Sequence, residues 1–135
     1  MSTPAEIGLQ RWHDMIANRD PGRLPDMIAE DAVFRSPAVH TPQKGRETVT
    51  AYLTGAMNVL GPEFHYEDEW VRERDAVLLF ASTVDGLEVH GIDLIRWDDD
   101  GHIVEFTVMI RPMKALQAVM GRMLDELTSL TDRPI

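Results

Sequence analysis

Asp93 is the residue of this sequence whose position most clearly suggests chemistry. It lies in VHGIDLIRW, residues 89–97, where apolar and polar residues nearly alternate as in a β-strand. In that alternation Asp93 shares a face with Val89, Ile95 and Trp97, so its carboxyl group points toward an apolar interior. A buried carboxylate must be protonated, paired or hydrated, because an unpaired buried charge is strongly unfavourable. We expect an acid that binds or protonates a ligand oxygen, with a pKa raised by desolvation. The alternative is a carboxylate that is paired within the fold, or one that is exposed because the strand register differs by one residue.

Three other polar residues could reach the same interior. Ser36 precedes Pro37 in FRSP, Ser82 lies in the apolar segment LLFASTV, and His40 lies in the loop AVHTPQKG over the expected pocket mouth. A histidine there could act as an acid or a base, or be an ordinary loop residue. Asp93 and His40 are therefore the candidate catalytic residues, and the two serines are candidate ligand contacts.

The sequence contains no recognisable metal-binding motif. It has no cysteine, so disulfides and thiolate metal sites are excluded. The segment DDDG, residues 98–101, lacks the alternating ligands and the closing glutamate of a calcium loop, and it predicts a hairpin turn instead. The histidines show no metal-ligand spacing; they are residues 13, 40, 65, 90 and 102. We expect neither a metal nor a cofactor.

Apolar residues spread over the predicted helices and strands indicate a pocket. A mostly apolar cleft with a few polar groups is the usual form of a small-molecule site. The alternative is that the same aromatic residues simply fill the core. The expected pocket wall consists of Trp12, Phe34, Tyr52, Met57, Phe64, Tyr66, Leu78, Phe80, Phe106 and Val108.

Helical spacing, strand alternation and turn residues predict the elements that would position these side chains. Thr3, Pro4 and Glu6 form the start signal of the first helix. The last helix begins near Pro112, and its apolar face comprises Met113, Leu116, Met120, Met123 and Leu127. The expected helices cover residues 3–18, 23–31, 46–60 and 111–127, and the expected strands cover 32–37, 63–73, 76–85, 87–97 and 103–111.

This order, α-α-β-α-β-β-β-β-α, predicts an α+β fold. Short connections between the last four strands predict an antiparallel meander. We expect a cone-shaped roll in which a strongly curved antiparallel β-sheet is covered on its concave face by about four helices. Phe64, Tyr66 and Trp70 are expected to share the apolar face of the first meander strand.

The segment 76–85 is apolar on both faces, which indicates that both faces are buried. One face would meet the helices, and a second copy of the chain would cover the other. We therefore expect a homodimer through the outer face of the sheet.

Length and charge limit the other partners. A chain of 135 residues, 44% of them hydrophobic, suits one domain over residues 1–135. The formal net charge of −10 makes nucleic acids and anionic membranes unfavourable partners. No apolar run approaches the roughly 18–20 residues of a membrane span. The start MSTPAEIGLQRW lacks the basic and apolar regions of a signal peptide, so a cytoplasmic location is expected.

The combination of this element order with EDAVFRSP, GRETVTAYL and GIDLIRWDDDGHIVEFTVMIRP resembles the nuclear-transport-factor-2-like superfamily, in particular its SnoaL-like branch. The resemblance covers nearly the whole chain. The superfamily includes ketosteroid isomerases, polyketide cyclases, epoxide hydrolases, dehydratases and non-catalytic members. The resemblance therefore implies the fold more specifically than it implies a reaction.

Position by position, the resemblance to ketosteroid isomerases implies a role for Asp93 alone. Asp93 matches the aspartate that donates a hydrogen bond to the substrate oxygen in those enzymes. Ser36 stands where their general-base aspartate is found, and Trp12 stands where their first helix has a tyrosine. Because serine is no proton acceptor near pH 7 without a base beside it, we expect no useful turnover of a Δ5-3-ketosteroid. The Asp-Arg-Asp set of the epoxide hydrolases is also missing, and the acid on the last strand of the polyketide cyclases is replaced by Arg111.

Two functions remain open from the sequence. The first is a protein that binds a small, largely apolar molecule in a cone-shaped pocket and catalyses an acid/base isomerisation, cyclisation or dehydration with Asp93 as the acid. The second is a non-catalytic ligand-binding or dimerisation module with a filled pocket. The sequence does not identify the ligand.

Overall fold

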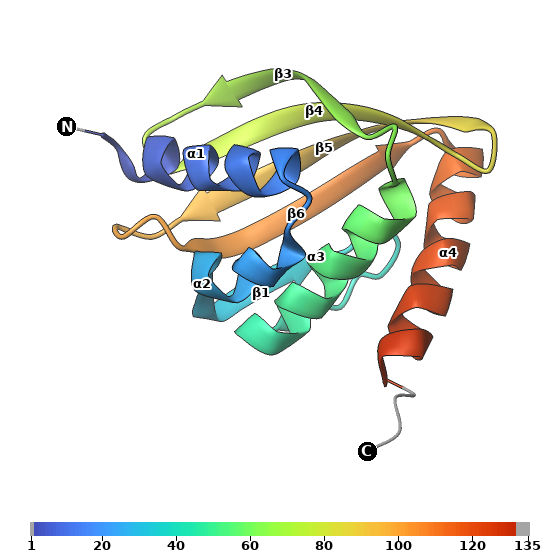
Figure 1. Cartoon of the computed structure of the whole chain (residues 1–135), viewed down its shortest axis with the longest axis horizontal. Helices are drawn as coiled ribbons and strands as arrows, with labels where there is room; N and C mark the ends of the chain where they lie inside the picture. The colour runs from blue at the N-terminus through green and yellow to red at the C-terminus, as the bar shows by residue number, and fades with distance from the viewer. Residues whose placement is uncertain (1, 132–135) are drawn as a thin grey trace.

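The chain forms a layer of helices against one strongly curved sheet (Figure 1). The computed structural model describes residues 2–131. No helix in this range is both long enough and apolar enough to span a membrane. The elements are α1 (Pro4–Ala17), the 3-10 turn η1 (Pro21–Arg23), α2 (Leu24–Met27), β1 (Ile28–Arg35), β2 (Gln43–Lys44), α3 (Arg46–Leu60), β3 (His65–Val71), β4 (Asp75–Val84), β5 (Leu87–Trp97), β6 (Ile103–Arg111) and α4 (Met113–Thr131).

The α+β roll with a curved sheet is confirmed, although the sheet is mixed. Its strand order is β2-β1-β6-β5-β4-β3. The pairs β3–β4, β4–β5 and β5–β6 are antiparallel, as expected for a meander. The prediction of a wholly antiparallel sheet is wrong for β1, which pairs parallel with β6. The long chain segment between these two strands allows that crossover.

The predicted second helix is too long. It was expected over residues 23–31, but α2 ends at Met27 and β1 already begins at Ile28. Ile28 pairs with Ile103 on β6, so tertiary strand pairing prevails over the helical spacing of the local sequence. The short strand β2 was not predicted; Gln43 pairs with Phe34 on β1.

The first helix begins as predicted. The Oγ1 atom of Thr3 accepts a hydrogen bond from the backbone N–H of Glu6 at 3.2 Å, and Pro4 occupies the first helical position. This bond satisfies one of the free N–H groups at the helix start.

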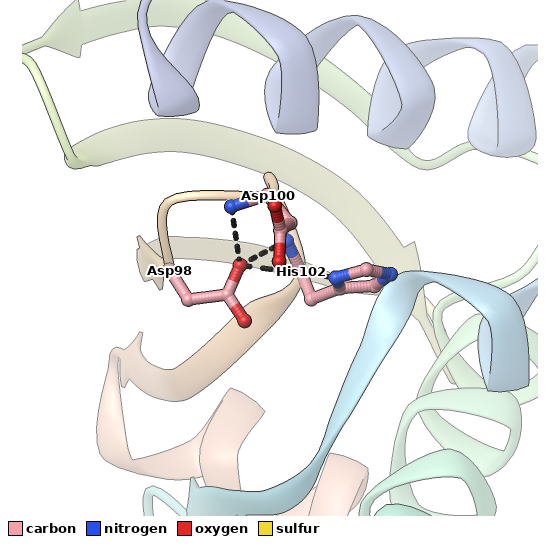
Figure 2. Close-up of side chains that lie close together, drawn as sticks. All are labelled: Asp98, Asp100 and His102. Atoms are coloured by element: carbon pink, nitrogen blue, oxygen red, sulfur yellow. Dashed lines mark hydrogen bonds and ion pairs between the residues drawn. The ribbon is translucent and has the colours of Figure 1, made fainter.

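The segment 98–101 forms the expected hairpin turn between β5 and β6 (Figure 2). The Oδ1 atom of Asp98 accepts hydrogen bonds from the backbone N–H groups of Asp100, at 3.0 Å, and His102, at 2.9 Å. The turn needs a left-handed residue, which Gly101 supplies with φ +79°. Asp98, Asp100 and His102 could place three ligand atoms within 4.8 Å of one another. The hydrogen bonds between Asp98 and the backbone of Asp100 and His102 explain why these three side chains lie close together without a metal ion. The absence of a metal site stays a prediction.

One side chain of β3 lies on the other face from the one predicted. Tyr66 pairs with Phe80 on the helix-covered face, but the register shifts between Tyr66 and Asp68. This β-bulge reverses the alternation beyond it. Trp70 consequently pairs with Val77 on the outer face and is 56% exposed. The prediction that Trp70 shares an apolar face with Tyr66 is therefore wrong.

The alternation predicted for β5 is correct. Val89, Ile95 and Trp97 are buried on the face that also carries Asp93. On the same strand, Gly91 pairs with Phe80 of β4. A Cβ atom at Gly91 would lie 2.3 Å from Cζ of Phe80 and 2.6 Å from the backbone oxygen of Met109. The glycine therefore makes room for the Phe80 ring beside the strand that carries Asp93.

Gly91→Ala should therefore destabilise the fold. Neither the ring of Phe80 nor the backbone of β6 can yield without disturbing the sheet, and overpacking of this kind costs about 1–3 kcal/mol. The matched control is Gly121→Ala on α4, where an added methyl group meets no atom within 4 Å. There alanine should stabilise the helix by up to about 1 kcal/mol. Urea unfolding of both variants checks this; a Gly91→Ala variant as stable as the wild type would contradict the packing described.

Candidate functional site

A cavity of about 270 Å³ lies between the curved sheet and the helices. Its wall is mainly apolar and comes from α1, β1, α3, β3, β5, β6 and α4 together with the loops after α1, β1 and α3. Two of its lining residues are exposed, Ala17 at the end of α1 and Arg19 just beyond it. We refer to this part of the wall as the rim.

Most of the predicted site residues lie around this cavity. They come from segments far apart in the sequence, which the fold brings together. Whether they contact a ligand stays a prediction. The predicted residues that line the cavity are Trp12, Phe34, Ser36, Tyr52, Met57, Phe64, Tyr66, Asp93, Phe106 and Val108.

Four predicted site residues do not line it. Leu78 and Phe80 are completely buried in the core, and the Phe80 ring packs at 5.2 Å from that of Phe64, which lines the cavity. Ser82 is also buried, and its hydroxyl group donates to the carbonyl oxygen of Leu60 at 2.5 Å, at the end of α3. His40 is exposed in the loop after β1. Inward-facing residues of β4 therefore form a layer behind the cavity wall.

The sequence interpretation missed much of the rim and the contribution of α4. Met120 and Met123 line the cavity; both belong to the predicted apolar face of α4, which could have indicated them. Met113, predicted for the same face, is 74% exposed at the start of the helix. Arg19 also lines the cavity, and no sequence pattern pointed to it.

A chain of two hydrogen bonds connects Trp12 to Asp93. The indole Nε1–H of Trp12, on α1, donates to the hydroxyl oxygen of Tyr66, on β3, at 2.8 Å. The Tyr66 hydroxyl in turn donates to Oδ2 of Asp93, on β5, at 2.6 Å. The indole N–H of Trp12 and the hydroxyl group of Tyr66 therefore both have hydrogen-bond partners in the interior. Among the described residues, Oδ1 of Asp93 has no hydrogen-bond partner, and Asp93 lines the cavity.

Burial controls the protonation of this group. Asp93 is 5% exposed, and desolvation raises the pKa of its carboxyl group to about 7, although the hydrogen bond from Tyr66 acts in the opposite direction. The expected direction of the pKa shift is therefore confirmed. Burial and the nearby Asp93 also raise the pKa of the Tyr66 hydroxyl well above its usual value. Near neutral pH, Tyr66 is thus a neutral donor, and Asp93 is present in both its protonated and its ionised form.

The site can donate a proton or a hydrogen bond, but it offers no second carboxylate. Among the described lining residues, Asp93 is the only acid and Arg19 the only cation. Ser36 accepts a hydrogen bond from the backbone N–H of Ala38 at 3.2 Å. Within residues 2–131, no basic side chain forms a hydrogen bond with Ser36, so it remains an ordinary hydroxyl group. The arrangement suits a ligand that presents an oxygen atom to a neutral carboxylic acid.

Comparison with known proteins points to one family. The SnoaL-like domain matches residues 9–106. A crystal structure named as a steroid delta-isomerase from Pseudomonas aeruginosa is 40% identical to this chain, with 98% of each chain covered and a TM-score of 0.92. An uncharacterised protein with a cystatin-like fold from Silicibacter pomeroyi is 30% identical, covers 93% of this chain and 86% of its own, and has a TM-score of 0.83.

A more distant structure shares the fold alone. A Mycobacterium tuberculosis protein in complex with estradiol-17beta-hemisuccinate is 18% identical, with 82% of this chain and 100% of that chain covered and a TM-score of 0.63. No curated protein matches this sequence significantly.

The raised pKa of Asp93 predicts a particular pH dependence of stability. Its folded-state pKa of about 7 exceeds the unfolded value near ~4, so the folded state retains a proton that the unfolded chain releases between these values. Asp93 should therefore lower the free energy of unfolding progressively as the pH rises from about 4 to about 7. Asp93→Asn keeps an acceptor for Tyr66 but does not titrate. The variant should match the wild type near pH 4 and be at least as stable at pH 7.

Urea unfolding midpoints of both proteins from pH 4 to pH 8 measure this difference, and the other acidic groups cancel in the comparison. An Asp93→Asn variant that is markedly less stable at pH 7, with the gap closing on acidification, would show that Asp93 is a paired structural anion.

Proposed function

Because this chain belongs to the SnoaL-like domain family of the nuclear-transport-factor-2-like superfamily, we propose that it binds a small, largely apolar molecule in its cavity and presents Asp93 to an oxygen atom of that molecule. The observation that carries the proposal is the buried carboxyl group of Asp93 at the cavity wall, held by Tyr66 at 2.6 Å. Residues 1–135 would then form a single SnoaL-like domain. Its cytoplasmic location stays a prediction.

The same geometry supports Asp93 as the acid in an isomerisation, cyclisation or dehydration. A protonated Asp93 can donate to a carbonyl or hydroxyl oxygen as negative charge develops there. The hydrogen bond from Tyr66 would stabilise the carboxylate that remains after proton transfer. A similar chain being named as a steroid delta-isomerase supports chemistry of this type. With Ser36 at the position of the isomerase base, lack of useful Δ5-3-ketosteroid turnover remains our expectation.

The alternative of a non-catalytic module with a filled pocket has less support. Side chains leave a cavity of about 270 Å³, slightly below the roughly 300–1,000 Å³ typical of ligand pockets. A module that serves only assembly has no need to keep a carboxyl group buried beside such a space. A ligand of modest size is therefore the better explanation.

We also propose that two chains associate through the outer face of the sheet. Leu79, Ile92 and Met109 lie in register across β4, β5 and β6 on that face. Met109 is 55% exposed in the single chain, and Trp70 adds another exposed apolar side chain. Leu79 and Ile92 are half-buried in the single chain, and apolar side chains grouped in this way on one face are typical of an interface.

The ligand proposal predicts selective binding of an oxygen-bearing compound. 2-Naphthol should bind more tightly than naphthalene, because its hydroxyl oxygen can meet Asp93. Asp93→Leu should lower the ratio of the affinities for 2-naphthol and naphthalene about tenfold, which is the usual effect of losing a strong hydrogen bond. Ser82→Ala is the control, since Ser82 is buried but lies outside the cavity wall. Calorimetric titration at pH 6 measures the affinities; equal affinities for both compounds, or a preference that survives Asp93→Leu, would contradict the proposal.

The assembly proposal predicts that Leu79→Glu yields a monomer or insoluble protein, because a charge would be buried at the centre of the interface. Gln117→Glu adds the same charge on the exposed side of α4 and should leave the dimer intact. Sedimentation equilibrium checks both variants. A wild-type mass of 15.3 kDa, that of one chain, across micromolar concentrations would refute the dimer.

A further inference from the structure

Arg19 occupies an unusual backbone position at the rim of the cavity. After α1 ends, its N–H bonds to the carbonyl oxygen of Ile16 and the N–H of Asp20 bonds to that of Met15, each at 3.1 Å. This pair of bonds is the Schellman pattern, whose left-handed residue is normally glycine. Arg19 adopts that conformation with φ +47°. A side chain here strains the backbone, so the residue type needs an explanation beyond the turn itself.

The guanidinium group of Arg19 retains unused donors. Its Nη1 and Nη2 atoms donate to the carbonyl oxygens of Gly61 and Pro62, at 3.2 and 3.0 Å, just after α3. An arginine has five N–H donors, so these two bonds leave others free. The ion pairs found among residues 2–131 include Arg23 with Asp20 but none with Arg19. Its charge is thus held in place by neutral carbonyl groups and is not neutralised by a carboxylate.

Asp93 is the one acid and Arg19 the one cation among the described residues that line this otherwise largely apolar cavity. Asp93 is buried, whereas Arg19 is exposed at the rim. A ligand that fills the space between them would meet a neutral acid inside and a fixed cation near solvent. Such a pair of groups discriminates between ligands by their polar ends, since the apolar wall discriminates poorly.

We propose that the natural ligand carries a carboxylate group, which binds Arg19 at the rim while an oxygen at its other end meets Asp93. This inference rests on the proposed function, because it assigns the ligand class of the same cavity. A carboxylate accepts N–H bonds from a guanidinium group, and Arg19 has donors left over from its two bonds to Gly61 and Pro62. The overall charge of −10 repels anions at long range, so the local contact with Arg19 must supply the selectivity.

A purely structural role for Arg19 makes a different prediction. If the side chain served only to join α1 to the end of α3, its removal would change stability and leave ligand preference unaffected. Glycine is the residue best suited to the left-handed position, so Arg19→Gly removes the side chain and relieves the strain at the same time. This variant should fold normally, which makes loss of ligand selectivity interpretable.

The test compares 6-hydroxy-2-naphthoate with its neutral carboxamide. The reference compound is 2-naphthol, which keeps the hydroxyl group but has neither the carboxylate nor the carboxamide. Binding is measured by calorimetry at pH 6 and constant ionic strength, where the naphthoate is ionised. The wild type should bind the naphthoate about twofold to fivefold more tightly than the carboxamide. In Arg19→Gly and Arg19→Gln this ratio should fall to about one, and the affinity for 2-naphthol measures how far each substitution disturbs the cavity itself. Arg23→Gln, which removes an arginine outside the cavity wall, should retain the full ratio.

The outcomes separate the two proposals. If 2-naphthol binds and depends on Asp93, but the naphthoate and the carboxamide bind equally, the carboxylate inference is overturned and the proposed function stands. A preference that persists in both Arg19 variants also overturns it. If none of the three compounds binds, the proposed function fails and the inference fails with it.

Discussion

The burial of one carboxyl group, that of Asp93, constrains the inner part of this structure. Its immediate surroundings are apolar, so its charged form is disfavoured and its pKa rises to about 7. The fold meets this constraint with Tyr66, which donates to Oδ2, and with Trp12, which donates to Tyr66. Three elements, α1, β3 and β5, thus converge on one polar group. Rearranging any of them would leave a buried polar atom unsatisfied, which costs more than the net gain of an ordinary hydrogen bond.

Helix α1 and the turn after it contribute to both the interior and the rim of the cavity. It supplies Trp12 to the hydrogen-bond chain inside, and the turn that follows it places Arg19 at the rim. Gly91 contributes to the cavity from the sheet. Because it has no side chain, the Phe80 ring can pack beside β5, behind the cavity wall. The cavity is therefore set by contacts between layers, and the aromatic residues divide into those that line it and those that support the lining.

Local sequence signals predicted what depends on local geometry. Alternation on β5 placed Asp93 on the buried face, and the start signal at Thr3 located α1, because each follows from the strand period or from a cap. The bond between Tyr66 and Asp93 was not predictable, since β4 lies between their strands and the alignment depends on sheet curvature. The β-bulge between Tyr66 and Asp68, which turns Trp70 outward, was also not predicted, because a bulge has no sequence pattern as clear as the alternation of a regular strand. The position of Arg19 was missed for a related reason: a non-glycine residue in the left-handed position contradicts the usual pattern.

The protonation state of Asp93 can be measured directly by difference infrared spectroscopy. The carbonyl stretch of a protonated carboxylic acid is separate from the bands of a carboxylate, and subtraction of Asp93→Asn spectra isolates this residue. If Asp93 is a desolvated acid at the cavity wall, its carbonyl band should be present at pH 5 and disappear with a midpoint near pH 7. A midpoint at or below the unfolded value near ~4 would show that the buried group is a stabilised anion, and it would contradict this account of the site.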